Sequence, residues 1–265
     1  MVLRVGEGLE MKRCIGLNKV SCSRFYDNLT TVITSQGYEA SHIWNVDETR
    51  VQAVGRNNTL KVVAKKGSRN VNVRACDSRE WLTILVCISA IGTFVPHYFI
   101  FKGTYLLQDY IQHCRPSAAV NVQENGWVTN EIFCDWLNHF RLNVPGGVSN
   151  DNKHLLVLDG HCSHVSAKAL DTCIKMGLDI ITIPSHSSHH MQPLDVSCFK
   201  PFKQYLQEDK AAMTLENPNW GNGVMLKSTL AKMAANALSK ALKPSNIISG
   251  FKTTGFYSIF SLNMC

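Results

Sequence analysis

The sequence has no apolar stretch long enough to cross a membrane. The longest, residues 82–95, is interrupted by Thr83, Ser89 and Gly92, and it is shorter than the roughly 20 residues that a transmembrane helix needs. The first residues also carry charges without the apolar run that follows them in a secretory signal. These absences predict a soluble, intracellular protein with no membrane partner.

Paired cysteines and an excess of acidic residues are absent as well. Ten cysteines are scattered from Cys14 to Cys265 without a CxxC pair, so the sequence predicts neither a zinc ribbon nor a disulfide framework. Asp and Glu number 20 against 27 Lys and Arg, which gives a net charge of +7. A positive balance favours a polyanionic partner such as nucleic acid without requiring one.

The sequence does contain enough apolar material for a folded core. Hydrophobic residues make up 45% of the 265 residues and charged residues 18%, which is typical of globular proteins and argues against disorder. We expect one principal domain over residues 41–213. A helical lead-in over residues 1–40 precedes it, and a helical tail over residues 214–265 follows it.

The order of the expected elements indicates an α/β fold. Apolar residues spaced three and four apart predict helices, and runs of β-branched and aromatic residues predict strands. These rules give a helix over 20–38, a strand ending at Asp47, strands over 81–92 and 93–103, a helix over 127–140 that Thr129 caps, a strand over 154–159, a helix over 166–176, a strand over 179–185, and helices over 196–213 and 229–242. The expected sheet is mixed, with strands 1–3 antiparallel and strands 4–5 parallel and joined by a right-handed crossover.

Three carboxylates stand where this order brings distant segments together. Asp47 and Asp159 end two strands, and Asp195 lies near the start of the helix after the last strand. Ligands of open α/β sheets gather outside the carboxyl ends of the strands, so we expect the three side chains to converge. Their oxygens suit Mg2+ or Mn2+. We assign all three as ligands of two such ions, with Asp47 bridging them.

Each aspartate taken singly also fits an ordinary structural role. An aspartate after a strand is commonly a turn former or a helix cap, so the hypothesis of a site depends on all three converging. Glu48 adjoins Asp47 but should point to the opposite face of the strand, because successive strand side chains alternate. We therefore prefer Asp47 as the ligand.

Histidines follow both Asp159 and the last strand, and two interpretations of them remain open. One is a zinc site that includes Cys162, although the spacing matches none of the common structural zinc patterns. The other, which we favour, is that polar side chains orient the carboxylates or contact phosphate. The residues assigned to this supporting role are His161, His164, His189 and Gln192.

Five motifs contain or separate the three aspartates. They are WNVDET around Asp47, IFKG at 100–103, GWVTNEIFCDWL at 126–137, LLVLDGHCSH around Asp159, and IPSHSSHHMQPLDVSCFKPFK around Asp195. These motifs resemble those of the pogo and Tigger group of DDE transposases, which includes jerky-like proteins and relatives of centromere protein B. The resemblance extends over residues 15–260, and its most specific part is the pair of motifs around Asp159 and Asp195.

The resemblance implies an RNase H-like fold and a DNA endonuclease that cleaves and transfers strands. It also implies catalysis by Asp47, Asp159 and Asp195 with two Mg2+ or Mn2+ ions. We further expect DNA as the partner, a nuclear location and no small-molecule cofactor, and we leave open whether the chain forms a homo-oligomer.

The chain departs from the family pattern at several positions. Arg50 stands where a glycine is usual after the first aspartate, and Ser185 and His190 replace the usual proline and leucine near the third. Members of the group usually begin with helix-turn-helix DNA-binding domains, whereas this chain starts close to the core. We therefore expect recognition of transposon ends to lie outside it.

Basic residues near the aspartates could line a path for the DNA backbone through salt-dependent phosphate contacts. Those assigned to it are Lys61, Lys65, Lys66, Arg69, Lys200 and Lys203. The alternative is an ordinary solvated basic surface. Two functions follow from the whole sequence: an active nuclease of mobile-element origin, or a domesticated DNA-binding or chromatin protein that does not cleave. A truncated gene model or a decayed element copy is the third interpretation.

Overall fold

The computed structural model describes residues 18–53, 65–67, 80–114, 117–160, 164–216 and 225–257. At its centre lies a six-stranded sheet with the strand order β4-β3-β2-β1-β5-β6. The strands are β1 (Ile43–Gln52), β2 (Trp81–Ser89), β3 (Tyr98–Lys102), β4 (Ala119–Gln123), β5 (His154–Asp159) and β6 (Leu178–Ile183). β1, β2 and β3 are antiparallel, whereas β3 and β4, β1 and β5, and β5 and β6 form parallel pairs.

This sheet confirms the predicted mixed α/β class and adds β4, which the sequence rules missed. The side chains of β4 are all partly buried, because it is an edge strand that is only half covered. Its short sequence, AVNVQ, has no run of large β-formers. The helix α3 (Gln108–His113) connects β3 to β4, as a parallel pair requires a crossover connection.

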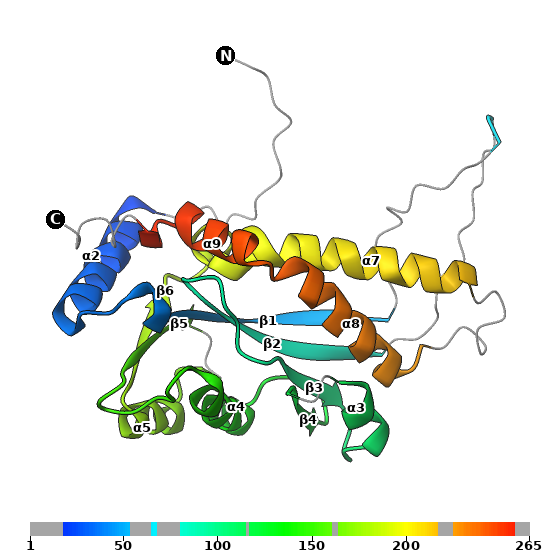
Figure 1. Ribbon diagram of the computed structural model, residues 1–265, viewed down its shortest axis with the longest axis horizontal. Coiled ribbons are helices and arrows are strands. Elements are labelled where there is room, and N and C mark those ends of the chain that lie inside the picture. Colours follow the sequence, from blue (N-terminus) through cyan, green and yellow to red (C-terminus); the bar gives the residue numbers. More distant parts are fainter. Residues whose placement is uncertain are drawn as a thin grey trace.

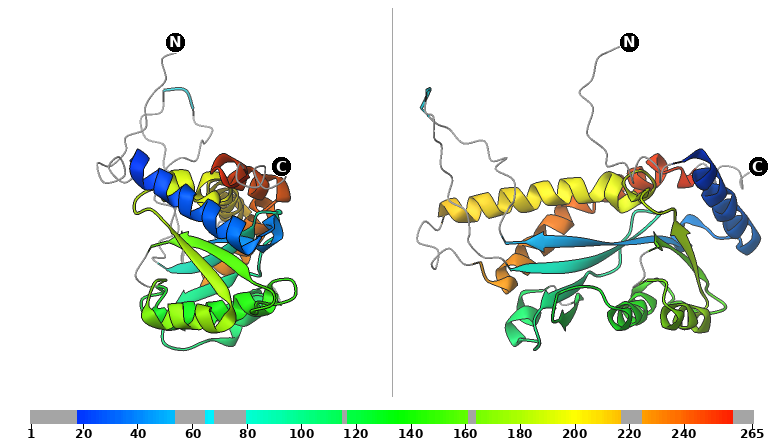
Figure 2. Two further views of the ribbon diagram at one scale, coloured as in Figure 1. Left: turned by 90° about the vertical axis from the view of Figure 1, so that its left-hand side faces the viewer. Right: turned by 180° about the vertical axis from the view of Figure 1, so that it is seen from behind.

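Helices cover both faces of the sheet (Figures 1 and 2). One face carries α4 (Asn130–Asn143) and α5 (Ala167–Met176), and the other carries α7 (Phe199–Glu216) and α8 (Lys227–Ala241). The side chains of β1 alternate between the two layers, because Trp44 and Val46 belong to the core under α4 and α5, whereas Ile43 and Val51 belong to the core under α7 and α8. This alternation decides which residues of β1 share a face.

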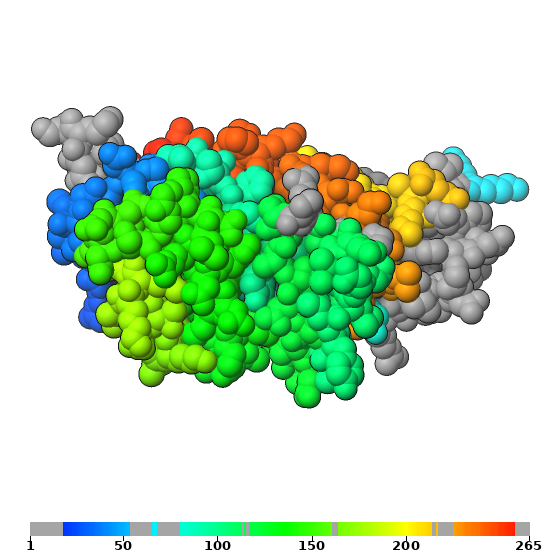
Figure 3. Space-filling model, turned by 60° about the horizontal axis from the view of Figure 1, so that its bottom comes forward, coloured from blue at the N-terminus to red at the C-terminus, as the bar shows by residue number. Residues whose placement is uncertain are grey.

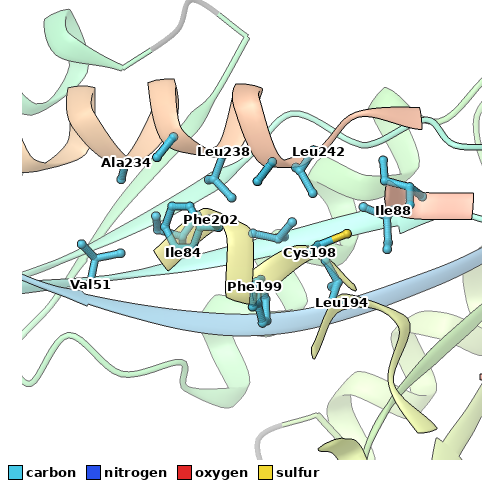
Figure 4. Packing of buried hydrophobic residues seen from close by; sticks show 14 of the residues in the cluster. Val51, Ile84, Ile88, Leu194, Cys198, Phe199, Phe202, Ala234, Leu238 and Leu242 are labelled. Atoms are coloured by element: carbon cyan, nitrogen blue, oxygen red, sulfur yellow. The ribbon is translucent and has the colours of Figure 1, made fainter. Parts of the chain in front are cut away.

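The core on the α7–α8 side fixes the short π-helical turn η2 (Leu194–Cys198) that leads into α7. Figure 4 shows Leu194, Cys198 and Phe199 packed between β1 and α8, close to Leu238 and Leu242. All five side chains are buried. Because burying apolar side chains of this size contributes about 1.5–3 kcal/mol each, η2 is held firmly against the sheet.

The helices α4 and α5 each begin at a side-chain cap. Thr129 accepts a hydrogen bond from the Ile132 backbone N–H and begins α4, which confirms the predicted cap. Ser166 caps α5 in the same way. The remaining helical elements are α2 (Lys19–Gln36), η1 (Ala40–His42), α6 (Ser188–Met191) and α9 (Pro244–Thr253).

The first and last described helical segments pack together. Phe25 of α2 makes an edge contact with Phe256 at a centroid distance of 6.4 Å, and the Tyr26 hydroxyl donates to the Thr254 carbonyl at 2.7 Å. These residues belong to the same hydrophobic core as the α7–α8 face of the sheet. The division into lead-in, core and tail therefore stays a prediction.

Candidate active site

Asp47 and Asp159 lie beside each other on neighbouring parallel strands. Asn45 of β1 is opposite Val157 of β5, and two residues further along each strand stand Asp47 and Asp159. Residues two apart on a strand share a face. Both carboxylates therefore stem from the α7–α8 face of the sheet, Asp159 at the carboxyl end of β5 and Asp47 in the middle of β1. The prediction that the first strand ends at Asp47 is wrong, because β1 continues to Gln52 in antiparallel pairing with β2.

Asp195 reaches the same region on η2. The Leu194 backbone N–H donates to Asn45 Oδ1 at 3.2 Å, and Asn45 Nδ2 in turn donates to the Val157 carbonyl at 3.1 Å. Gln192 Nε2 donates to the Val46 carbonyl at 3.2 Å. Both amide side chains are fully buried, so they tie η2 to β1 and β5 and fix where Asp195 stands.

Asp47 is electrostatically coupled to the other predicted carboxylates. Burial raises the pKa of Asp47 well above its usual range, and the charges of Asp195, Glu48 and Asp159 raise it further. A hydrogen bond from the Glu48 backbone N–H to Asp47 Oδ1, 2.8 Å long, acts in the opposite direction. Like charges held together in a buried place are unfavourable unless a proton or a cation compensates them.

His164 enters this cluster from the segment after β5. Its Nδ1 lies 2.8 Å from Asp159 Oδ1, and its Nε2 lies 2.9 Å from Glu48 Oε1. Burial alone would lower the pKa of His164, but the hydrogen bonds and charges of the two carboxylates outweigh it and raise the pKa to about 10. The imidazole is therefore protonated at neutral pH, and both of its nitrogens donate.

Glu48 is a member of the site that sequence reasoning had set aside. It stands on the α4–α5 face of β1, as strand alternation predicts, yet His164 connects it to Asp159. Two features of the sequence could have indicated its role. They are the adjacent acids Asp47 and Glu48 in WNVDET and the second histidine, His164, of LLVLDGHCSH. Alternation alone could not show that a histidine would link the two faces at the strand ends.

The structure describes only one of the two remaining histidines to which a supporting role was assigned. His189 lies in α6 with its ring 4.3 Å from that of His190, and His161 and Cys162 fall outside the described residues. Within the described residues, no three His, Cys, Asp or Glu side chains are close enough to share one metal ion.

The predicted DNA-contacting residues are exposed where the structure describes them. Lys200 and Lys203 lie one turn apart on α7, directly after η2, and both are exposed. Lys65 and Lys66 are exposed as well. Lys61 and Arg69 fall outside the described residues.

The mixed six-stranded sheet of this chain, covered by helices on both faces and carrying acidic residues on the adjacent central strands β1 and β5, has the RNase H-like fold. The chain belongs to the DDE superfamily endonuclease family, whose model matches residues 78–251. Asp159 and Asp195 lie inside the matched residues, and Asp47 precedes them.

The chain matches curated relatives over part of their length. The chain is 28% identical over 167 residues to the human protein "Pogo transposable element with KRAB domain", of which it spans 26%. It is 32% identical over 180 residues, 68% of its own length, to a Cochliobolus lunatus protein named "MFS-type transporter clz9", of which it spans 19%. Within the described residues, no helix has the length and apolarity to span a membrane.

Solved structures confirm the fold. The Mos1 transposase paired-end complex with the left transposon end matches 94% of this chain and 66% of that one, with a TM-score of 0.53 and 12% identity. Mos1 paired-end complexes with Mn and with Mg match with a TM-score of 0.50 and 11% identity. At such identities the likeness concerns the fold.

Proposed function

We propose that this chain is the catalytic core of a DNA endonuclease of transposase origin, in which Asp47, Asp159 and Asp195 bind Mg2+ or Mn2+. The observation that carries the proposal is the cluster of carboxylates around Asp47, where burial and then the repulsion of Asp195, Glu48 and Asp159 raise the pKa of Asp47. A divalent cation would relieve this repulsion. The relatives named for transposable elements and the Mos1 complexes with DNA ends, Mn and Mg support the same substrate and ions.

The donor set fits a hard cation. Mg2+ takes oxygen ligands, usually one or two carboxylates completed by water and substrate phosphate, so two of the three aspartates from β1, β5 and η2 would suffice at each ion without a closed protein cage. Two such ions would supply activation of the attacking oxygen and stabilisation of the leaving oxygen. The carboxylates would serve as ligands, and His164 and Gln192 would hold Asp159 and η2 in place.

The partner in this proposal is DNA, and the location is the nucleus. Lys200 and Lys203 directly follow the carboxylate on η2 and would contact phosphates of the strand that enters the site. Lys65 and Lys66 would extend this path, together with Lys61 and Arg69. These contacts would be sequence-independent and would weaken as salt rises.

A nicking assay on supercoiled DNA tests the proposal. The parent should nick in Mg2+ or Mn2+ and not in chelator, and Asp159→Asn should reduce the rate by about a thousandfold or more, as loss of an essential catalytic group does. The matched control is Asp171→Asn, because Asp171 is exposed on α5 and pairs only with Lys175 at 2.6 Å among the contacts that the structure describes. The control should cut like the parent.

Two results would contradict the proposal. Metal-dependent cleavage that survives Asp159→Asn would exclude the assigned carboxylates. A parent that binds DNA as tightly as Asp159→Asn, and cuts in neither metal, would favour the second function, a domesticated DNA-binding or chromatin protein.

A further inference from the structure

Two cation–π pairs lie next to each other on the α4–α5 face of the sheet. The Arg50 guanidinium carbon lies 3.9 Å from the ring centroid of Trp127, and Lys102 Nζ lies 4.3 Å from that of Trp81. Arg50, Trp81 and Lys102 come from the adjacent strands β1, β2 and β3. The pairing of Gln52 with Trp81 and of Leu82 with Phe101 brings these side chains to one end of the sheet.

This aromatic and cationic cluster lies on the same face of β1 as Glu48 and on the opposite face from Asp47. Arg50 follows Glu48 by two residues, so both side chains stand on the same face of β1. The strand runs from Asp47 toward Arg50, which places the cluster just beyond the proposed active site. Figure 3 shows the face that carries α4 and α5, with α3 and β4 beside them.

Contacts of Gly126 with the sheet fix the loop that carries Trp127. The Gly126 carbonyl accepts a hydrogen bond from Thr83 Oγ1 at 2.7 Å, and Gly126 has a φ of 64°. A Cβ at this position would lie 3.0 Å from Trp81 Nε1 and 3.2 Å from Lys102 Cβ. Only glycine combines this backbone conformation with so close an approach, and the result is a Trp127 side chain held in place at the surface.

Trp127 stays accessible in spite of this support. It is 51% exposed, and Arg50 on it is exposed as well. Two nearby acidic side chains have other partners, because Glu48 Oε1 lies 2.9 Å from His164 Nε2 and Glu80 forms an ion pair with Lys227 at 3.2 Å. The cluster therefore offers a flat aromatic surface and positive charge that nearby carboxylates do not fully neutralise.

We propose that Trp127, with Arg50 stacked on it, binds an unpaired base of the DNA next to the cleavage site, and that Lys102 contacts the neighbouring phosphate. This inference rests on the proposed function for the identity of the ligand. Aromatic rings stack on the π-face of any base, and cations beside them contact the strand backbone. Arg50 supplies a cation and a second planar group that the glycine usual at this position could not provide.

Binding of DNA that contains 2-aminopurine tests the proposal, with the full chain in chelator so that no cleavage occurs. A duplex with a single-stranded end should bind with quenching of the unpaired 2-aminopurine. Trp127→Ala should abolish this quenching and weaken binding about tenfold, within the range seen for base–aromatic stacking. Trp127→Phe should keep the quenching, and Arg50→Ala should weaken binding less than Trp127→Ala does.

The matched controls lie at the far end of α4. Leu142→Ala removes a side chain that is 82% exposed, and Arg141→Ala removes one exposed positive charge as Arg50→Ala does. Both should bind and quench like the parent. Fully paired duplex should respond little to Trp127→Ala, because its bases are not free to stack.

Equal affinity and quenching in the parent and in Trp127→Ala would overturn the inference and leave the pair a structural contact. If Trp127→Ala fails to fold, Arg50→Ala decides, since unchanged binding there would overturn the role of the pair. The assay is independent of catalysis. A parent that never nicks DNA yet shows Trp127-dependent quenching would contradict the proposed nuclease and keep this inference, whereas cleavage with Trp127-independent binding would do the reverse.

Discussion

The two ends of the β1–β5 strand pair each hold one buried histidine, and the two histidines are in opposite states. His154 begins β5 and is 1% exposed, and His164 follows the end of β5 and is 2% exposed. Burial and the nearby His42 lower the pKa of His154 to about 4. Asp159 and Glu48 overcome the effect of burial and raise the pKa of His164 to about 10.

Burial is nearly equal at the two ends, so the neighbours decide the charge. His154 accepts a hydrogen bond from Trp44 Nε1 at 3.0 Å, which only a neutral ring can do. His164 instead donates to two carboxylates. The amino end of the strand pair is therefore a neutral packing site, whereas the carboxyl end concentrates ionised groups, as a site for cations and phosphate needs.

Replacing the charged histidine should produce the largest effect on stability. His164→Gln removes the positive charge between Asp159 and Glu48 and should lower the free energy of unfolding by about 2 kcal/mol. This is less than the 3–5 kcal/mol for fully buried pairs, because the two carboxylates are 34% and 24% exposed. Urea unfolding at pH 7 in chelator measures it.

A double-mutant cycle checks the cause. If repulsion between unpaired carboxylates is responsible, Glu48→Gln should cost less in the His164→Gln background than in the parent, because its partner is already gone. Additive effects of the two substitutions would contradict the bridge and point to a local packing change.

Removing the partly buried charge of Asp47 should have a smaller effect of opposite sign. Asp47→Asn relieves burial of a charge and repulsion from Asp195, Glu48 and Asp159, so the Tm should rise by about 2–4 °C, which corresponds to about 1 kcal/mol in a domain of this size. Thermal unfolding in chelator at pH 7 measures it. The gain should shrink in Mg2+, because an ion that binds the parent more tightly stabilises it by mass action.

The exposed Asp171→Asn is the control for this substitution and should leave the Tm unchanged. A Tm that falls in Asp47→Asn would show that its hydrogen bond with the Glu48 N–H outweighs the repulsion. In that case the carboxyl end would not be the strained end of the strand pair.

The sequence predicted those parts of the molecule that depend on local pattern. The run HLLVLD at β5 is continuous in apolar residues and stops at Asp159, which is how a strand covered on both faces ends. The spacing of Ile132, Trp136 and Phe140 predicted α4, whose cap is Thr129. The rule that ligands of open α/β sheets gather outside the carboxyl ends of the strands then predicted that Asp47 and Asp159 come together.

The remaining features depend on contacts between distant segments. Nothing in the periodicity shows that His164 reaches both Glu48 and Asp159, or that Arg50 lies on Trp127, since each contact joins residues far apart in the chain. The sequence rules did not predict β4, because an edge strand needs little apolar surface. Residue alternation predicted the face of Glu48 correctly. The position of His164 between the two faces depends on tertiary structure, which alternation does not show.

The smallest expected effect compares the two histidines directly through pH. The pKa of His154 falls from 6.5 in the unfolded chain to about 4 in the folded one. The unfolded state therefore binds more protons, and stability is lost as pH falls through this window. Between pH 7 and pH 6 the loss is about 0.7 kcal/mol. The raised pKa of His164 has the opposite sign, because its contribution is lost as pH rises from 6.5 toward 10.

The two contributions should nearly cancel in the parent between pH 7 and pH 6, and single substitutions should separate them. His154→Gln removes the loss at the amino end, so this variant should gain about 0.7 kcal/mol relative to the parent over the same interval. His164→Gln should instead lose stability relative to the parent over this interval, because it removes the gain at the carboxyl end. Urea unfolding at the two pH values measures both slopes. If the two variants change with the same sign, the histidines do not differ in charge, and the contrast between the neutral and the ionised end of the strand pair is wrong.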